Sequence, residues 1–258
     1  MSKPVLLIRG AGNDVDALAL SKLGLTSLID PYLDIEVSAE TRDAFELLDF
    51  LVAQHGLTWL IATSVNALKF WIEIIGHDRL VEAISAHPEL HFAAIGKATA
   101  KALSELGAHP VLTPEEATSA ALSATLQDFP PGTAIIPSGN LAMTNLPRDL
   151  EEVGWTVRSG IVYTTAPKVG EPESASMVRR SEVAAILLRS PSAVRAFLTH
   201  VPSLQIPKEV VIVCAGPTSA KAATEFGIRV DAVATDPTPE SVAVTIHSLL
   251  ARRNHGNH

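Results

Sequence analysis

One pattern of apolar run, glycine and helix occurs twice in the chain, and this duplication constrains the fold more than any other feature. Residues 95–107 read IGKATAKALSELG, and residues 215–227 read AGPTSAKAATEFG. Between the first and last glycine of each copy, six of twelve aligned positions are identical. The runs HFAAI and VVIVCA lead into the two copies. A buried strand followed by a turn and an amphipathic helix is typical of α/β proteins.

Further apolar runs predict a complete set of strands. The longer runs are continuously apolar instead of alternating, which is typical of parallel strands covered by helices on both faces. The predicted strands are 4–9, 59–63, 91–95, 133–137, 183–188 and 209–214, with shorter ones at 26–29, 109–112, 156–159 and 229–233. The segments between them space apolar residues by three and four, and many end at a glycine, as helices do. The fold class expected is therefore α/β, with doubly wound parallel sheets.

The duplication also predicts how the chain divides. Weaker echoes extend the repeat, but its second copy begins only near residue 183, which leaves too few strands for a full sheet. The first 35 residues supply a strand, a helix and a strand without a partner of their own. We therefore expect a discontinuous lobe of residues 1–37 and 167–258, with residues 38–166 inserted as the other lobe. The crossing segments, 34–40 and 161–168, would form a two-stranded β hinge.

Composition argues against several classes of function. The net charge is −8 and aromatic residues make up only 5%, so neither a basic surface nor a stacking platform for nucleic acid is indicated. The apolar run VLLI at 5–8 is too short to span a membrane, so a cytoplasmic protein without membrane attachment is expected. The single cysteine, Cys214, lies in an apolar run and is expected to be a buried small hydrophobe.

No metal or cofactor site is indicated either. The nine histidines are scattered, and no cysteine and histidine spacing suggests zinc. The loop RGAGND after the first strand has Val15 at the third glycine position of a dinucleotide-binding motif, and no phosphate-loop lysine follows. We therefore expect no metal, no nucleotide and no other cofactor.

Taken in order, several motifs resemble those of the uroporphyrinogen-III synthase family. These motifs, which together cover nearly the whole chain, are VLLIRG, LGLTSLIDPYLDIEV, ATSVNALKFW, AAIGKATAKAL, GWTVRSGIVYTTAP, CAGPTSAKAATEFG and VATDPTPESVAVTI. The resemblance implies two flavodoxin-like lobes joined by a two-stranded ladder, with the active site between them. It implies closure of the linear tetrapyrrole hydroxymethylbilane to uroporphyrinogen III, with loss of water and inversion of ring D, by a monomeric enzyme of heme biosynthesis.

The implied substrate carries eight carboxylates although the chain is itself acidic, so local donors are needed to bind it. Helix N-termini provide such donors, because their first N–H groups lack partners within the helix. Glycines at the turns would allow close approach of the backbone, and hydroxyls would add further donors. The candidate substrate-binding residues are Arg9, Thr63, Ser64, Gly96, Thr99, Ser138, Gly139, Ser190, Gly216, Thr218 and Ser219. For the hydroxyl residues, a role as a helix cap alone is the simpler alternative. For Arg9 the alternative is an ion pair at the surface.

One catalytic residue is carried over from the resemblance. Tyr163 matches the tyrosine of the family's hinge strand, whose role would be to donate a proton to the departing hydroxyl. A phenol, with an ordinary pKa of about 10, is protonated at neutral pH and suits this role. Packing alone is the alternative. Neutral donors would also suit a reaction that passes through cationic azafulvene-like species.

The chain departs from the family's pattern at Gly10, Ser138 and Arg189. Proline often stands at the first position, a basic residue at the second, and a small or aromatic residue at the third. A transient contact with the preceding bilane-forming enzyme is a further expectation. The alternative to an enzyme is a two-lobed cytoplasmic binding or sensor protein for an anionic small molecule.

Overall fold

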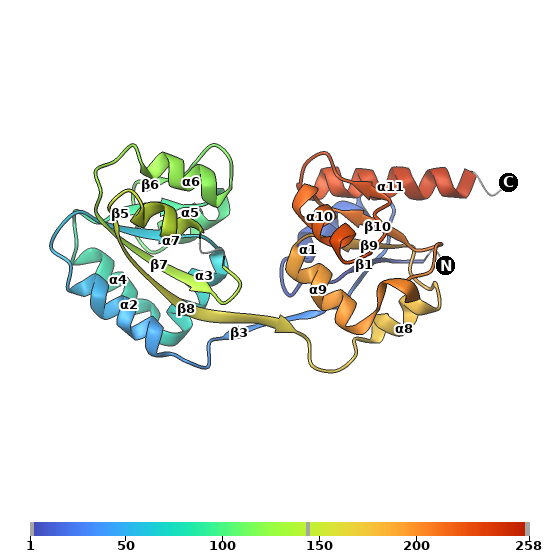
Figure 1. Ribbon diagram of the computed structural model, residues 1–258, viewed down its shortest axis with the longest axis horizontal. Helices are drawn as coiled ribbons and strands as arrows, with labels where there is room; N and C mark the ends of the chain where they lie inside the picture. Colours follow the sequence, from blue (N-terminus) through green and yellow to red (C-terminus); the bar gives the residue numbers. More distant parts are fainter. Residues whose placement is uncertain (1–2, 143–144, 256–258) are drawn as a thin grey trace. The chain divides into compact units, whose positions relative to one another are not determined.

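The computed structural model describes residues 3–142 and 145–255, and the chain divides into two compact units (Figure 1). The discontinuous unit consists of Met1–Ile35 and Ala166–His258, and the inserted unit is Glu36–Thr165. The lobe boundaries expected from the sequence differ from these by one or two residues. No helix within the described part of the chain is long and apolar enough to cross a membrane.

The discontinuous unit alternates strands and helices. Its strands are β1 (Val5–Leu7), β2 (Ser27–Ile29), β9 (Ala185–Leu188), β10 (Val211–Cys214) and β11 (Ala232–Val233). Its helices are α1 (Asp14–Ser21), α8 (Glu173–Arg179), α9 (Pro191–His200), α10 (Pro217–Glu225) and α11 (Pro239–His255), with a short 3₁₀ helix at Ser203–Gln205.

The inserted unit follows the same alternation. Its strands are β4 (Thr58–Ala62), β5 (His91–Ala94), β6 (Val111–Leu112) and β7 (Thr133–Gly139), together with β3 (Leu33–Val37) and β8 (Thr156–Pro167), which extend past its boundaries. Its helices are α2 (Arg42–Val52), α3 (Val65–Ile75), α4 (His77–Ser85), α5 (Lys97–Ser104), α6 (Ser119–Leu126) and α7 (Asn145–Glu151).

The two sheets have the same parallel topology with the chain entering at different points. The discontinuous unit has the strand order β2-β1-β9-β10-β11, which is the flavodoxin-like order 2-1-3-4-5. The inserted unit has the order β3-β8-β7-β4-β5-β6. Without β3, its β8 and β7 occupy the places of β2 and β1, although they come last in that unit instead of first. The expected fold class of two doubly wound parallel sheets is therefore confirmed.

The core of the discontinuous unit lies on both faces of its sheet, because successive strand residues point to opposite sides. On one face Leu6, Ile186 and Ile212 pack under α8, α9 and α10. On the other face Val5 and Leu187 pack under α1 and α11. These strands are buried along their whole length, which explains their continuously apolar sequence.

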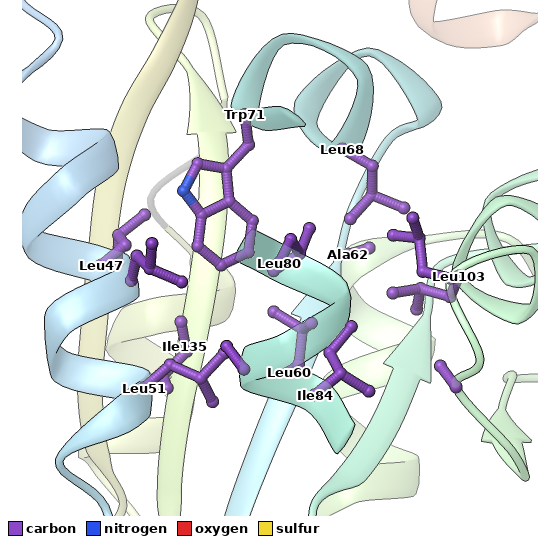
Figure 2. Packing of buried hydrophobic residues seen from close by; sticks show 14 of the residues in the cluster. Leu47, Leu51, Leu60, Ala62, Leu68, Trp71, Leu80, Ile84, Leu103 and Ile135 are labelled. Atoms are coloured by element: carbon purple, nitrogen blue, oxygen red, sulfur yellow. The ribbon is translucent and has the colours of Figure 1, made fainter. Parts of the chain in front are cut away.

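The inserted unit buries its sheet in the same way. Figure 2 shows its larger cluster, in which Trp71 of α3 has Leu47 and Leu51 of α2 on one side and Ala62 and Leu103 on the other. The indole N–H of Trp71 donates to the Ala44 carbonyl at 2.9 Å, so the polar atom of this buried side chain is satisfied. A second cluster on the other face packs α6 and α7 against β4, β5 and β7.

Helix ends follow the glycine signals of the sequence. Gly107 after α5 and Gly227 after α10 both have positive φ, +89° and +72°, which is the left-handed conformation that closes a helix. Helices α4, α6 and α8 were not singled out from the sequence, although Leu80, Ala83 and Ile84 of α4 follow the helical spacing of three and four. The chain from 156 to 167 is one long strand instead of two segments.

Strands β3 and β8 contain both places where the chain passes from one unit to the other. They are neighbours in the sheet (Figure 1). The Ser38 N–H donates to the Val162 carbonyl at 3.1 Å, and the Lys168 N–H donates to the Tyr32 carbonyl at 2.9 Å. These bonds show two adjacent strands at the crossings. Their use as a hinge stays a prediction.

Candidate functional site

Each unit gathers polar residues at the edge of its sheet where the parallel strands end. Open α/β sheets bind ligands at this edge. In the discontinuous unit β1, β9 and β10 lead to Arg9, Arg189 and the turn at Gly216. In the inserted unit the corresponding strands are β7, β4 and β5. Strand β7 ends at Gly139, β4 leads to Thr63, and β5 leads to the turn at Gly96.

The strand registers make these positions equivalent one by one. In the discontinuous unit Ala185 pairs with Val5 and with Val211. In the inserted unit Trp59 pairs with Ala134 and with His91. The row of Val5, Ala185 and Val211 and the row of Ala134, Trp59 and His91 therefore occupy equivalent places in the two sheets.

In each strand, the residue at the sheet edge comes four positions after the residue of this row. Arg9 then corresponds to Ser138, and Arg189 corresponds to Thr63. One unit places two guanidinium groups where the other places two hydroxyls.

Two of the predicted hydroxyls cap helices. Ser64 Oγ accepts from the Ala67 N–H at 3.0 Å at the start of α3, and Ser190 Oγ accepts from the Ala193 N–H at 3.2 Å at the start of α9. Capping accounts for both serines as structural residues. Ser64 has one further neighbour, because its Oγ lies 3.5 Å from the Tyr163 hydroxyl.

The two glycine turns have the same extended backbone, with φ of −172° at both Gly96 and Gly216. This conformation does not itself require glycine. A Cβ atom at Gly216 would meet nothing within 4 Å, whereas at Gly96 it would lie 3.2 Å from the Ala117 Cβ. The glycine at 216 therefore keeps open the space in front of the first turn of α10.

The hydroxyls of these turns are placed differently from one another. Thr99 and Ser219 occupy equivalent positions and both are buried. The Ser219 hydroxyl donates to the Gly216 carbonyl at 2.9 Å, so it stabilises the turn itself. Thr218 is exposed and lines a cavity at this edge. Of the two predicted hydroxyl residues in the α10 turn, Thr218 is therefore the one whose side chain is exposed to a ligand in the cavity.

Tyr163 is held at the sheet edge by an irregularity in β8. The register between β7 and β8 shifts so that Ser138 pairs with Ile161 but Gly139 pairs with Tyr163. A bulge of this kind redirects the side chains that follow it. A Cβ at Gly139 would lie 2.4 Å from Tyr163 Cζ, so the absence of a side chain there provides the space for the phenol ring.

The described side chains that contact Tyr163 are uncharged, although Lys69 Nζ lies 5.1 Å from the centroid of the neighbouring Phe70 ring. The Phe70 ring of α3 stacks on the phenol with centroids 5.5 Å apart. The Ser138 hydroxyl donates to the Gly160 carbonyl at 3.1 Å. Asn140 binds β8 with its side chain: its Oδ1 accepts from the Thr165 N–H at 2.8 Å. These contacts fix β8 on both sides of Tyr163.

Arg189 is a partly buried residue of the discontinuous unit with a fully buried partner, Asp16. Its guanidinium donates to both carboxylate oxygens of Asp16 in α1, one of them at 2.7 Å, and to the Pro237 carbonyl at 2.7 Å. Only 10% of the Arg189 side chain and 1% of the Asp16 side chain are exposed. The two planar groups therefore form a fixed, desolvated pair.

Arg9 lies beside this pair without a carboxylate of its own. Among the residues that the structure describes, no carboxylate oxygen lies within 4.0 Å of its guanidinium, and its one side-chain hydrogen bond is a long one of 3.5 Å to the Gly12 carbonyl. The pKa of Arg9 is lowered from its ordinary value, first by burial and then by the positive charge of Arg189. The surface ion pair that was the alternative role for Arg9 is not present.

A cavity of about 370 Å³ lies at this edge of the discontinuous unit. Arg9, Arg189, Ser190, Gly216, Thr218 and Pro237 are among its lining residues. It combines two cationic side chains with the first turns of α9 and α10, which begin at Pro191 and Pro217 and therefore have no N–H at their first position. Later N–H groups of these first turns lack partners within the helix, and that of Ala193 is bonded to the Ser190 cap. The cavity can therefore accept an anionic group.

Cys214 takes no part in either edge. It is fully buried in β10, as expected from its apolar run, and burial raises the pKa of its thiol to about 11. Within residues 3–142 and 145–255, no three histidine, cysteine, aspartate or glutamate side chains are grouped as metal ligands would be.

Sequence reasoning did not identify Phe70, Asn140 or Asp16 as parts of these edges. Phe70 reads as an ordinary apolar position of α3, and Asp16 as an acidic residue in the first turn of α1. The sequence signal that could have indicated the Asp16 contact was Arg189. It departs from the family's pattern, and a charge next to a buried strand needs a partner.

Two parallel sheets, each with caps, glycine turns and polar groups at its carboxyl-end edge, place the chain in the class of two-unit α/β proteins. The carboxyl-end edge is where open α/β sheets generally bind ligands. A structure of a mutant uroporphyrinogen III synthase from the extremely thermophilic bacterium Thermus thermophilus is 19% identical, covers 97% of this chain and 98% of its own, and has a TM-score of 0.60. Uroporphyrinogen-III synthetase from Helicobacter pylori is 15% identical over 96% of this chain and 99% of its own, with a TM-score of 0.63. Both likenesses concern the fold.

The chain belongs to the family described as uroporphyrinogen-III synthase HemD, whose family model matches residues 14–243. The resemblance stated from the sequence is thereby confirmed. The chain is an enzyme of heme biosynthesis that acts on a small tetrapyrrole. The alternative of a binding or sensor protein is not favoured.

Proposed function

We propose that the chain converts hydroxymethylbilane into uroporphyrinogen III as a cyclising hydro-lyase that needs no cofactor. The terminal hydroxyl leaves as water, and ring D attacks the resulting cation with the α-carbon that already bears its methylene bridge, which gives a spiro intermediate. The old bond between ring D and that bridge then breaks and re-forms at the free α-carbon of ring D, so the macrocycle closes with ring D inverted. The observation that carries the proposal beyond the family match is the placement of Tyr163. Its phenol lies at the carboxyl-end edge of a parallel sheet, in space that Gly139 leaves free.

Tyr163 would act as the proton donor. As the C–O bond breaks, the pyrrole nitrogen supplies electrons to the carbon, and the leaving oxygen takes the phenolic proton and departs as water. Ring closure releases a proton from the attacking pyrrole carbon, which restores the phenol. Ser64, whose Oγ is 3.5 Å from the phenol oxygen, would orient the hydroxyl.

The side chains that contact Tyr163 suit this chemistry, because Phe70, Ser64 and Ser138 carry no charge that would oppose a cationic azafulvene-like species. The Phe70 ring attracts cations, and it already has Lys69 Nζ 5.1 Å from its centroid. The substrate's carboxylates would be bound by other donors, namely helix N-termini and the hydroxyls of Thr63 and Thr218, whereas the predicted donor Thr99 is buried.

The test is to supply freshly made hydroxymethylbilane and separate the oxidised products by chromatography. The wild-type chain is expected to give the type III isomer, and Tyr163→Phe is expected to give it about tenfold more slowly, because the hydroxyl leaves readily from a pyrrole-activated carbon. Gly139→Ala should also slow turnover, since its Cβ would displace the ring. The matched control is Tyr32→Phe, which changes the chain's other tyrosine, a buried residue of the discontinuous unit.

Formation of the type I isomer alone, which is the spontaneous product, would refute the proposed function. Type III formation at the wild-type rate by Tyr163→Phe would retain the function but remove Tyr163 from the mechanism.

The proposal extends to a transient contact with the enzyme that forms the bilane, because free bilane closes spontaneously to the type I isomer. The type III fraction should then be higher when that enzyme generates the bilane in the same solution than when the same amount is added free. Equal fractions would argue against the contact.

A further inference from the structure

We propose that the cavity at Arg9 and Arg189 in the discontinuous unit is a binding site for one carboxylate group, with Arg9 as the residue that contacts it. This inference rests on the proposed function, because the carboxylate would be one of the acidic side chains of the tetrapyrrole. It gives the candidate Arg9 a defined role, a charged subsite for a single carboxylate, which the other, uncharged candidates do not provide.

The charge count of the cavity favours a single negative charge. Arg189 is neutralised by Asp16, which accepts hydrogen bonds from it on both carboxylate oxygens. Arg9 has no such partner among the described residues. The two arginines and the aspartate therefore leave a net charge of +1, which one carboxylate would balance.

The position of Arg9 makes it costly to leave unpaired. It is half-buried, so its guanidinium has lost part of its hydration, and Arg189 lies close enough to repel it, an effect that Asp16 offsets only in part. A bound anion would relieve both effects, and a carboxylate matches the planar fork of a guanidinium. Arg189 is already held in place by Asp16 and by the Pro237 carbonyl, so it forms a fixed wall of the site.

The remaining lining suits the short hydrocarbon arm that carries such a carboxylate. Ala215, Pro217 and Pro237 present apolar surface, and Gly216 presents none that would obstruct the entry. Thr218 adds a hydroxyl and the backbone N–H of the first turn of α10. The cavity thus joins a cation, a hydrogen-bond donor and apolar walls within about 370 Å³.

The equivalent edge of the inserted unit lacks both arginines, since Ser138 and Thr63 occupy their positions. The charged carboxylate site is therefore a property of the discontinuous unit alone.

The experiment measures binding of uroporphyrin III, the oxidised product with its eight carboxylates, by quenching of its fluorescence on the full-length protein. Arg9→Gln is expected to raise the Kd about tenfold or more, the size of a lost charge-assisted hydrogen bond. Arg9→Lys, which keeps the charge but not the planar fork, should give an intermediate Kd. In urea unfolding, Arg9→Gln should be at least as stable as wild type, because the charge that it removes is partly desolvated and is repelled by Arg189.

Arg195→Gln is the matched control. Arg195 is an exposed arginine of α9, the helix whose first turn lines the cavity, so its loss removes the same charge from outside the site. Its Kd should stay within twofold of wild type. An unchanged Kd in Arg9→Gln, an equal rise in Arg195→Gln, or no binding of uroporphyrin III by the wild-type protein would overturn the inference.

Competition identifies the class of anion. At matched ionic strength, glutarate should displace uroporphyrin III from the wild-type protein more effectively than inorganic phosphate does. The reverse order would refute a carboxylate site. The product assay stays separate: an Arg9-dependent Kd without any type III isomer would reject the proposed function and keep the anion site, whereas type III formation with an Arg9-independent Kd would do the opposite.

Discussion

The two units use one scaffold for two different chemical environments. Both have the same parallel strand order, a serine cap on the helix after one central strand, and a glycine turn after the next. The discontinuous unit places Arg9 and Arg189 at its sheet edge, whereas the inserted unit has hydroxyls there and holds Tyr163 beside Gly139. The shared features are those that form the backbone, and the different ones are those that face a ligand.

This difference shows how a duplicated fold can divide its tasks. Caps and turns satisfy backbone groups that every copy of the scaffold must satisfy, so they are retained in both. Side chains beyond the strand ends have no such constraint and can diverge. The hypothesis that neutral donors bind the whole substrate therefore suits the inserted unit, while the discontinuous unit adds two guanidinium groups.

The largest effect that would sharpen this comparison is expected at Arg189. Arg189→Gln would leave the carboxylate of Asp16, 1% exposed, without its ion-pair partner, and we expect the free energy of unfolding to fall by about 3–5 kcal/mol. Thr63→Ala, the equivalent change in the inserted unit, should cost less than about 1 kcal/mol. Chemical denaturation followed by circular dichroism measures both.

Adding Asp16→Asn to Arg189→Gln should recover part of the lost stability, because the buried charge is then gone. Similar losses from Arg189→Gln and Thr63→Ala would contradict the distinction between a buried ion pair in one unit and simple hydroxyls in the other.

Tyr32 of the discontinuous unit, which is buried, provides a second comparison with Tyr163 of the inserted unit. We expect the titration of Tyr32 to change the free energy of unfolding by about 2–3 kcal/mol. Burial raises the pKa of Tyr32 to about 12 from its ordinary 10.0, while its hydroxyl shares a 3.0 Å hydrogen bond with Ser174. The pKa of Tyr32 is higher in the folded than in the unfolded chain. Its favourable contribution to the free energy of unfolding is therefore complete below about pH 10 and is lost as the pH rises to about 12.

Denaturation curves of wild type and Tyr32→Phe at pH 8 and pH 11.5 measure this effect. The wild-type chain should lose more stability between the two pH values than the variant does. Identical pH dependence in the two proteins would show that Tyr32 is not the group responsible.

The smallest expected effects separate the two serine caps. Ser64→Ala and Ser190→Ala should each lower the free energy of unfolding by about 1 kcal/mol, because each removes one acceptor for a first-turn N–H. Only Ser64→Ala should lower kcat, since Ser64 lies 3.5 Å from the Tyr163 hydroxyl. Ser190→Ala should affect KM at most. Equal losses of kcat in the two variants would remove the functional distinction between the caps.

Much of the fold was readable from the sequence because its signals are local. A strand buried on both faces must be apolar along its length, as VLL and VIVC are in β1 and β10. A helix that ends in a left-handed residue favours glycine, as at Gly107 and Gly227. The offset of the repeat and the unpartnered first 35 residues indicated a division of the chain close to the observed one.

The candidate sites were only partly readable because their decisive contacts join distant residues. Arg189 and Asp16 are 173 positions apart, and Ser64 and Tyr163 are 99 apart. Neither a periodic pattern nor a motif indicates which acidic residue will lie beside a given arginine. The role of Gly139 was likewise hidden, because it depends on a one-residue shift in the pairing of β8.

The sequence by itself determined the strands, the caps and the repeated turns of this protein, since each depends on burial or backbone geometry within about a dozen residues. Only the tertiary structure decided that Asp16 neutralises one arginine and leaves Arg9 with a free charge, and that the Tyr163 ring occupies the space over Gly139. Charge balance and steric fit are properties of neighbours in space, and parallel strand pairing sets those neighbours across long stretches of chain.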